Sequence, residues 1–330
     1  MKTPKFSIIM PCYNSERYLN EAIKSVLDQK WHNWELILIN DGSTDRTLEI
    51  IKHFQKSDNR IFVHSKPNGG YVSAVNFGLK LITGDYFLMM GSDDRLDSGL
   101  LDQIADSVAN IEPDIIAFRT LKVIDNVIQG YDEITNFRDK QYLSNVSIKE
   151  CEQIAGNDRT ILFVRDTSKC FRHSKLNGLQ YFGKFGYDAD GIFSTLFSQR
   201  CTSFLFLPVD GYYWTLREDS LSAKPNKHID FDRLNNWDVF VDHISRFNIN
   251  DISQHAKDYL TYALGIAKKT LKNHNAISIS ELKRLTTIQL KILSFCNTNN
   301  IRSNSIDKLR KWRRFLLIYN IIFRIRFFNN

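Results

Sequence analysis

The sequence lacks the patterns that mark secreted and membrane-spanning chains. No apolar run is long enough to span a bilayer. The N-terminus leads directly into an apolar segment at Phe6, without the basic stretch, long apolar core and small-residue cleavage site of a secretory signal. These absences predict a cytoplasmic protein.

Paired cysteines are also missing. The number of cysteines is odd, and none of them shows the close spacing that zinc sites and redox sites use. We therefore expect free thiols in a reducing compartment, which agrees with a cytoplasmic location. The cysteines are Cys12, Cys151, Cys170, Cys201 and Cys296.

Basic charge is scarce outside the last thirty residues. The net charge is +7, and residues 301–330 hold eight lysines and arginines against one aspartate, so the first 300 residues are neutral overall. A nucleic-acid-binding protein is expected to carry basic charge across its working face. The uneven distribution therefore predicts no nucleic-acid partner, and a local partner for the tail.

The C-terminal third has mostly helical patterns, with helices expected at 231–247, 254–272, 278–297 and 305–328. A helical wheel of the last one puts basic residues on one side and aromatic and aliphatic residues on the other. Such a helix can lie in a membrane interface and attract anionic lipids, through residues 305–330, on the inner face of the plasma membrane. The alternative is that its apolar side packs on the preceding helices.

The first 110 residues alternate apolar runs with helical patterns, which is typical of a mostly parallel α/β sheet with right-handed crossovers and helices on both faces. The loops that follow successive strands then gather along one sheet edge, where such folds bind ligands. The expected strands are 6–10, 34–39, 61–64 and 86–90. The expected helices run from a cap at Asn14 or Ser15 to Leu27, from Thr47 to Phe54 and from Ser73 to Leu81.

Two adjacent carboxylates, Asp93 and Asp94, directly follow the apolar run that ends near Met90. At the carboxyl end of a buried strand they would repel each other unless a positive charge lay between them. Carboxylate oxygens suit magnesium or manganese, whose coordination shell is commonly completed by phosphates of a substrate. The alternative is that both acids begin a surface turn and cap a helix starting near Ser98.

Glycine is absent from residues 11–17, directly after the first expected strand. This absence excludes the G-x-G-x-x-G fingerprint of dinucleotide-binding folds. It also disfavours a sugar nucleotidyltransferase, which would need a glycine-rich loop at this position.

The sequence contains the segments FSIIMPCYN, WELILINDGSTDRTLEII, NGGYVSAVNFGLKLITGDYFLMMGSDDRL, SKCFRHSKL, FGYDADGIF and SLS. Together they resemble family 2 of the nucleotide-sugar glycosyltransferases, which have the GT-A fold. The resemblance covers residues 4–222 in pieces. It implies a GT-A domain at 1–225, with a donor half at about 1–110 and an acceptor half at about 111–225. A helical region at 226–330 follows.

The resemblance implies that the donor is a nucleotide sugar, most simply UDP-linked. In the family, the position of Asp41 holds the uracil edge, while those of Pro11 and Tyr13 line the base and ribose. A carboxylate can accept the imide N–H and a tyrosine ring can stack on the base. The remaining donor-binding candidates are Asn68 in the third loop, Asn76 in an R-N-x-G element whose arginine is Val75 here, Ser92, and Arg217 in a loop resembling one that closes over the diphosphate.

The metal motif of the family is Asp-x-Asp, and here it reads Gly91, Ser92, Asp93. The first aspartate is therefore missing, whereas Asp93 keeps the position that holds the cation and Asp94 follows it. The resemblance thus implies manganese or magnesium as the cofactor, with Asp93 and Asp94 as its ligands.

The family places its catalytic base where this chain has Asp188, in GYDADG. A carboxylate there could take the proton of an acceptor hydroxyl that attacks the anomeric carbon, which would invert the configuration. Asp190 is a rival for this role, and the alternative is that both acids cap a helix beginning near Ile192.

The implied acceptor is a glycan or a lipid-linked saccharide of a bacterial surface polysaccharide. The competing hypothesis is a catalytically silent protein that binds a nucleotide or a glycan, since Gly91 and Val75 depart from the family motifs.

Overall fold

The computed structural model describes residues 3–133, 135–136, 138–155, 162–163, 165–182, 189–217 and 239–244, with the single residues 287, 291, 294 and 295. The chain divides into two compact units, residues 1–225 and 226–330. In the second unit the described residues 239–244 are helical, while the expected tail helix lies outside the described residues, so its membrane role stays a prediction. No helix in the described part of the chain is long and apolar enough to cross a membrane.

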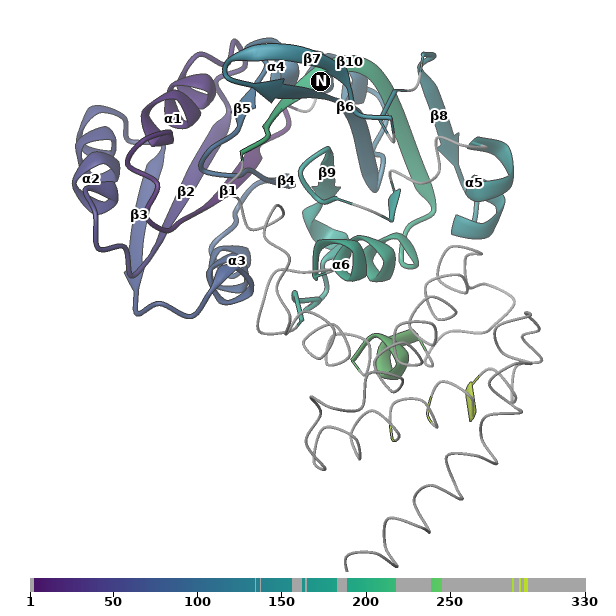
Figure 1. The fold of residues 1–330 in the computed structure, drawn as a ribbon. Coiled ribbons are helices and arrows are strands. Elements are labelled where there is room, and N and C mark those ends of the chain that lie inside the picture. Colours follow the sequence, from purple (N-terminus) through teal and green to yellow (C-terminus); the bar gives the residue numbers. More distant parts are fainter. Residues whose placement is uncertain are drawn as a thin grey trace, which may run out of the picture. The chain divides into compact units, whose positions relative to one another are not determined.

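The first unit is built from strands and helices that alternate up to residue 108 and then give way to a strand-rich half (Figure 1). The strands are β1 (Phe6–Cys12), β2 (Trp34–Asp41), β3 (Ile61–Lys66), β4 (Tyr86–Met89), β5 (Arg95–Leu96), β6 (Ile115–Ile124), β7 (Val127–Tyr131), β8 (Gln141–Ser144), β9 (Lys169–Arg172) and β10 (Ser203–Thr215). The helices are α1 (Leu19–Leu27), α2 (Thr47–Ser57), α3 (Tyr71–Leu79), α4 (Leu100–Val108), α5 (Ile148–Ala155), the 3₁₀ turn η2 (His173–Lys175) and α6 (Ala189–Ser198).

One ten-stranded sheet in the described residues has the order β3-β2-β1-β4-β9-β6-β10-β5, with β7 paired to β6 and β8 to β10. The four strands expected from the sequence, β1 to β4, are present and parallel. The second half is mixed, because β9 runs antiparallel to both β4 and β6 while β10 is parallel to β6. The α/β fold class with helices on both faces is therefore confirmed.

The two faces of β1 and β2 pack against different helices, since side chains alternate along a strand. Ile8 and Met10 belong to the core that also contains Ile23 of α1 and Ile51 of α2. On the opposite face, a Cβ at Gly78 of α3 would lie only 2.5 Å from Cγ2 of Ile9. The glycine therefore allows α3 to approach the sheet closely enough to set the position of its N-terminus.

The expected start of the first helix is wrong, and the starts expected near Ser98 and Ile192 differ from the observed ones by two and three residues. Helix α1 begins at Leu19 after Tyr18, not after a side-chain cap at Asn14 or Ser15. The amide of Ser15 instead donates to Oγ1 of Thr47 at 2.8 Å, which commits this residue to the loop. Helix α4 begins at Leu100 without a side-chain cap, so neither Asp93 nor Asp94 caps it, and α6 begins at Ala189, three residues before Ile192.

A buried carboxylate, Glu35 of β2, joins three segments at the end of the sheet opposite the loops described below. It accepts hydrogen bonds from Nζ of Lys5 at 2.7 Å, Oγ of Ser7 at 2.6 Å, and the amide and hydroxyl of Thr83, both at 2.7 Å. Burial alone would raise the pKa of Glu35, but these hydrogen bonds outweigh it and lower the pKa below its ordinary value. The ionised form is therefore the one that the fold holds.

We expect Glu35→Gln to lower the free energy of unfolding by about 2–3 kcal/mol, because hydrogen bonds to a charged buried group are replaced by weaker ones and one acceptor is lost. Urea unfolding followed by circular dichroism measures this change. Glu49→Gln is the matched control, since Glu49 pairs with Arg46 on the surface and its loss should change stability much less than the loss of Glu35 does. Equal effects of the two substitutions would contradict the role of Glu35.

Candidate active site at the carboxyl edge of the sheet

The loops that follow β1 to β4 are hydrogen-bonded to one another at the carboxyl edge of the sheet (Figure 1). The hydroxyls of Ser15 and Ser92 lie 2.7 Å apart and join the first loop to the fourth. The Asn14 side chain accepts from the Thr44 amide at 2.8 Å and joins the first loop to the second. The edge that the sequence predicts as a ligand site therefore exists as a connected set of loops.

Asp41 links the second loop to the third. Its carboxylate accepts hydrogen bonds from Nζ of Lys66 at 2.5 Å and from the amides of Gly69 and Gly70 at 3.0 and 2.8 Å. Gly70 has φ of +80°, a conformation that favours glycine and aims its amide at the carboxylate. An ionised carboxylate offers about four acceptor positions, so Asp41 can accept one further donor.

The two acids after β4 lie in different environments. Asp94 is buried, and its two oxygens accept hydrogen bonds from the Tyr212 hydroxyl at 2.6 Å and the Thr215 amide at 2.8 Å. Burial and then the charge of Asp93 raise the pKa of Asp94 to about 7. Asp94 is therefore held in place by β10, while Asp93 is left partly exposed.

The charge of Asp93 is paired by Arg217, which follows β10. Nη2 of Arg217 donates to Oδ2 of Asp93, and both side chains are about three-quarters buried. The guanidinium also lies over the ring of Tyr18, 4.4 Å from its centroid. The sequence predicts that a metal cation neutralises the two acids. In the structure, Arg217 provides a positive charge beside Asp93.

The residues present fit a divalent cation only in a restricted way. Both oxygens of Asp94 already accept protein hydrogen bonds, and within the described residues no three His, Cys, Asp or Glu side chains are grouped so that they could hold a metal. A single carboxylate together with phosphate oxygens is nevertheless a common way for magnesium to bind. Asp93 fits this role if Arg217 moves away from it.

Gly91 occupies a position where a larger residue would collide with the acidic turn. A Cβ at Gly91 would lie 2.5 Å from Oδ2 of Asp94 and 2.9 Å from Oδ1 of Asp93. The Gly91 amide also donates to the Tyr212 hydroxyl at 2.9 Å. The missing first aspartate of the motif is therefore coupled to the tight turn that holds Asp94 against β10.

The other donor-binding candidates differ in what they can still bind. Tyr13 is 52% exposed and Asn68 is also exposed, whereas Pro11 is half-buried in β1 opposite Ile39. Both polar atoms of the Asn76 side chain pair with the backbone of Tyr181 at 2.8 Å. Asn76 thus fixes the neighbouring segment, and a direct contact with a donor would require these bonds to break.

Of the two candidate bases, Asp188 lies outside the described residues. Asp190 lies in the first turn of α6, partly buried, and Oδ1 accepts from the Gly191 amide at 2.8 Å. Burial raises the pKa of Asp190. A raised pKa is suited to a carboxylate that must take a proton near neutral pH.

Sequence reasoning missed Tyr212 and Asp166, two residues that organise this edge. Tyr212 lies in an apolar strand and Asp166 in an irregular segment. The neighbouring sequence therefore gives no sign that the Tyr212 hydroxyl or the Asp166 carboxylate forms a hydrogen bond. Both are recognised only through partners that are far away in the sequence.

Comparisons with known proteins identify the family that this chain resembles and its fold. Residues 7–170 match the family described as glycosyl transferase family 2. An uncharacterized glycosyltransferase of Haemophilus influenzae is 45% identical over 104 residues, which are 31% of this chain and 42% of the relative. Glycosyltransferase GlyA of Streptococcus pneumoniae is 27% identical over 221 residues, which are 66% of this chain and 31% of the relative. The chain thus spans less than half the length of these relatives.

The fold is also found in solved structures. The structure of residues 1–349 of S. aureus TarS in complex with UDP-GlcNAc has a TM-score of 0.67 and 20% sequence identity, and the match covers 88% of this chain and 81% of that one. At this level of identity the likeness establishes the fold.

We expect Gly91→Ala to destabilise the protein by about 1–3 kcal/mol, because the added methyl group pushes into the two carboxylates. Thermal unfolding measures the change. Gly99→Ala is the matched control in the next turn, where a Cβ would meet only side-chain atoms at 3.2 Å or more. If Gly91→Ala were as stable as Gly99→Ala, the turn would not require glycine.

Proposed function

Because the chain belongs to glycosyl transferase family 2, we propose that it transfers a sugar from a UDP-linked donor to a hydroxyl of a glycan or lipid-linked acceptor, with inversion. The observation that carries the proposal is the Asp93–Arg217 pair at the carboxyl edge of the sheet, beside the loops that Asp41 and Ser15 connect. When a diphosphate binds at this site, Arg217 can leave Asp93 and pair with the phosphate oxygens.

The donor would lie across the loops after β1, β2 and β3. Asp41 has an acceptor position left for the uracil imide, and the exposed ring of Tyr13 can stack on the base. Pro11, Asn68 and Ser92 would line the nucleoside and phosphates. Support comes from TarS, whose structures contain UDP and UDP-GlcNAc, and from the minor teichoic acid biosynthesis protein GgaB of Bacillus subtilis, which matches 30% of this chain.

Two positive charges would act on the diphosphate. Asp93 would hold magnesium or manganese, and such an ion, when bound, stabilises negative charge on the leaving phosphates. Arg217 would leave Asp93 and donate to the phosphate oxygens, for which a guanidinium fork is well suited. Asp94 would keep the acidic turn in place through Tyr212 and Thr215.

The acceptor would be activated by a carboxylate at the beginning of α6. We assign this role to Asp188, with Asp190 as its rival. The base takes the hydroxyl proton while the oxygen attacks the anomeric carbon from the face opposite UDP, so the new glycosidic bond forms as the bond to the phosphate oxygen breaks. The configuration at the anomeric carbon is thereby inverted.

Neutralisation of Asp93 by Arg217 also favours a second candidate, a silent nucleotide-binding protein, because such a pair needs no cation. Turnover distinguishes the two. Release of UDP from a panel of UDP-sugars supports the transferase, whereas binding without release from any donor supports the silent protein.

We expect UDP to bind wild-type protein in the presence of manganese and to bind at least about tenfold more weakly when either manganese or Asp93 is removed, since one charged contact is worth more than about 1.4 kcal/mol. Calorimetric titration of UDP into wild type and Asp93→Ala measures this. Asp106→Ala is the control, because Asp106 is an exposed acid on α4. Equal affinity without manganese and without Asp93 would rule out a metal site there.

We expect Arg217→Gln to bind manganese more tightly than wild type in the absence of nucleotide, because Asp93 loses its partner, and to bind UDP about tenfold more weakly. Both affinities come from calorimetry. The control is Arg95→Gln, since Arg95 also pairs with an acid, Glu21, and lies over a tyrosine ring. Unchanged affinities for manganese and UDP in Arg217→Gln would contradict the exchange of partners.

A further inference from the structure

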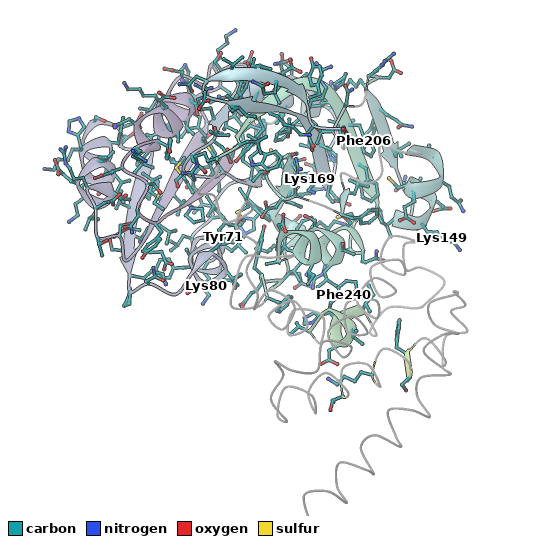
Figure 2. The ribbon with its side chains drawn as sticks, in the orientation of Figure 1. Tyr71, Lys80, Lys149, Lys169, Phe206 and Phe240 are labelled. Atoms are coloured by element: carbon teal, nitrogen blue, oxygen red, sulfur yellow. The ribbon has the colours of Figure 1, made fainter. Side chains whose placement is uncertain are left out.

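A buried group of charged and phenolic side chains connects α3, β9 and α6. We call Tyr71, Asp166, Lys169, Tyr181 and Asp190 the Asp166 cluster. Figure 2 labels two of its members, Tyr71 at the start of α3 and Lys169 at the start of β9. Oδ2 of Asp166 accepts hydrogen bonds from the hydroxyls of both Tyr71, at 3.3 Å, and Tyr181. The Asp166 side chain is 2% exposed, so it does not reach a substrate itself.

The cluster is tied to the loop that binds Asp41. Tyr71 directly follows Gly69 and Gly70, whose amides hold that carboxylate. One turn further along α3, Asn76 fixes the backbone of Tyr181 through two hydrogen bonds. Asp166 therefore receives both of its phenolic donors from segments whose position depends on α3.

The cluster is equally tied to α6. The ring of Tyr181 stacks on Phe193 with 4.2 Å between centroids and 15° between planes. Phe193 lies one turn after Asp190 in α6. The first turn of this helix thus contains Asp190, one of the two candidate bases. A displacement of Tyr181 would therefore shift Phe193 and, with it, the first turn of α6.

The charges of the cluster depend on one another. Burial, and after it the charge of Asp190, raise the pKa of Asp166 to about 6. Lys169 is fully buried, and burial lowers its pKa to about 7 although both acids favour its charged form. Arg165 also contributes positive charge, but it donates to Asp132 at 2.5 Å and lies over Trp214. Lys169 is thus the buried cation whose charge both Asp166 and Asp190 stabilise.

We infer that, with Asp190 as the base, Asp166 is a positioning residue for the transfer reaction: through its hydrogen bonds to Tyr71 and Tyr181, and through the stacking of Tyr181 on Phe193, it sets the position and the charge of Asp190. This inference rests on the proposed function. When the charge of Asp166 is removed, the positive charge of Lys169 acts on Asp190 alone. Asp190 also no longer experiences the repulsion of a second negative charge. The base then holds its proton less strongly.

The test compares wild type with Asp166→Asn, which keeps the size and the acceptor of the side chain and removes its charge. We expect the acid limb of kcat against pH to move down by about one pH unit, since a nearby like charge is removed, with little change in KM for the donor. Lys169→Gln should move the same limb up. Asp97→Asn is the matched control, because Asp97 also accepts a tyrosine hydroxyl, that of Tyr213 at 3.2 Å.

A second measurement does not depend on activity. Titration of lysine side chains by NMR should give a midpoint for Lys169 that is lower in Asp166→Asn than in wild type, because an acid that favours the charged lysine is gone. Folding of each variant is checked by its Tm, and Lys169→Gln decides the acid limb if Asp166→Asn does not fold.

An unmoved acid limb and an unmoved lysine midpoint would overturn the inference and leave the transferase intact. Failure of wild type to release UDP from any donor would instead overturn the proposed function, and the lysine midpoint would then decide alone whether Asp166 controls the charge of the cluster.

Discussion

The hydrogen bonds of Asp94 to Tyr212 and Thr215 hold the turn after β4 against the end of β10. Because Asp94 is fixed from inside the domain, Asp93 is directed toward the edge of the sheet. Arg217 follows Thr215 by two residues, so the same contacts bring its guanidinium to Asp93. The turn after β4 and the residues that follow β10 thus meet at these two adjacent carboxylates.

Two adjacent acids can serve different purposes because their environments differ. Asp94 accepts two hydrogen bonds from β10, but burial and the charge of Asp93 outweigh them, so the pKa of Asp94 is raised. Asp93 remains accessible to a cation or an arginine. Gly91 leaves room for both carboxylates, since a Cβ there would lie 2.5 Å from Oδ2 of Asp94 and 2.9 Å from Oδ1 of Asp93. The lost aspartate of the motif and the presence of Tyr212 are therefore parts of one arrangement.

The sequence alone was enough for the elements whose signal is local. The apolar runs located β1 to β4, and the polar residues after them located the loops that Asp41 and Asp93 occupy. It was not enough where a partner is distant: Arg217 lies 124 residues from Asp93, and no periodicity relates them. The cap expected at Ser15 was wrong for the same reason, because its amide bonds to Thr47 in another loop.

Helix α3 connects two parts of the candidate site. Its N-terminal amides hold Asp41, and Asn76 holds Tyr181, which in turn bonds to Asp166 and stacks on α6. Gly78 allows this helix to lie close to Ile9, so packing against the sheet leaves it little freedom to shift. Helix α3 therefore contacts both the loop that holds Asp41 and the Asp166 cluster, so the relative position of these two groups depends on how α3 packs on the sheet.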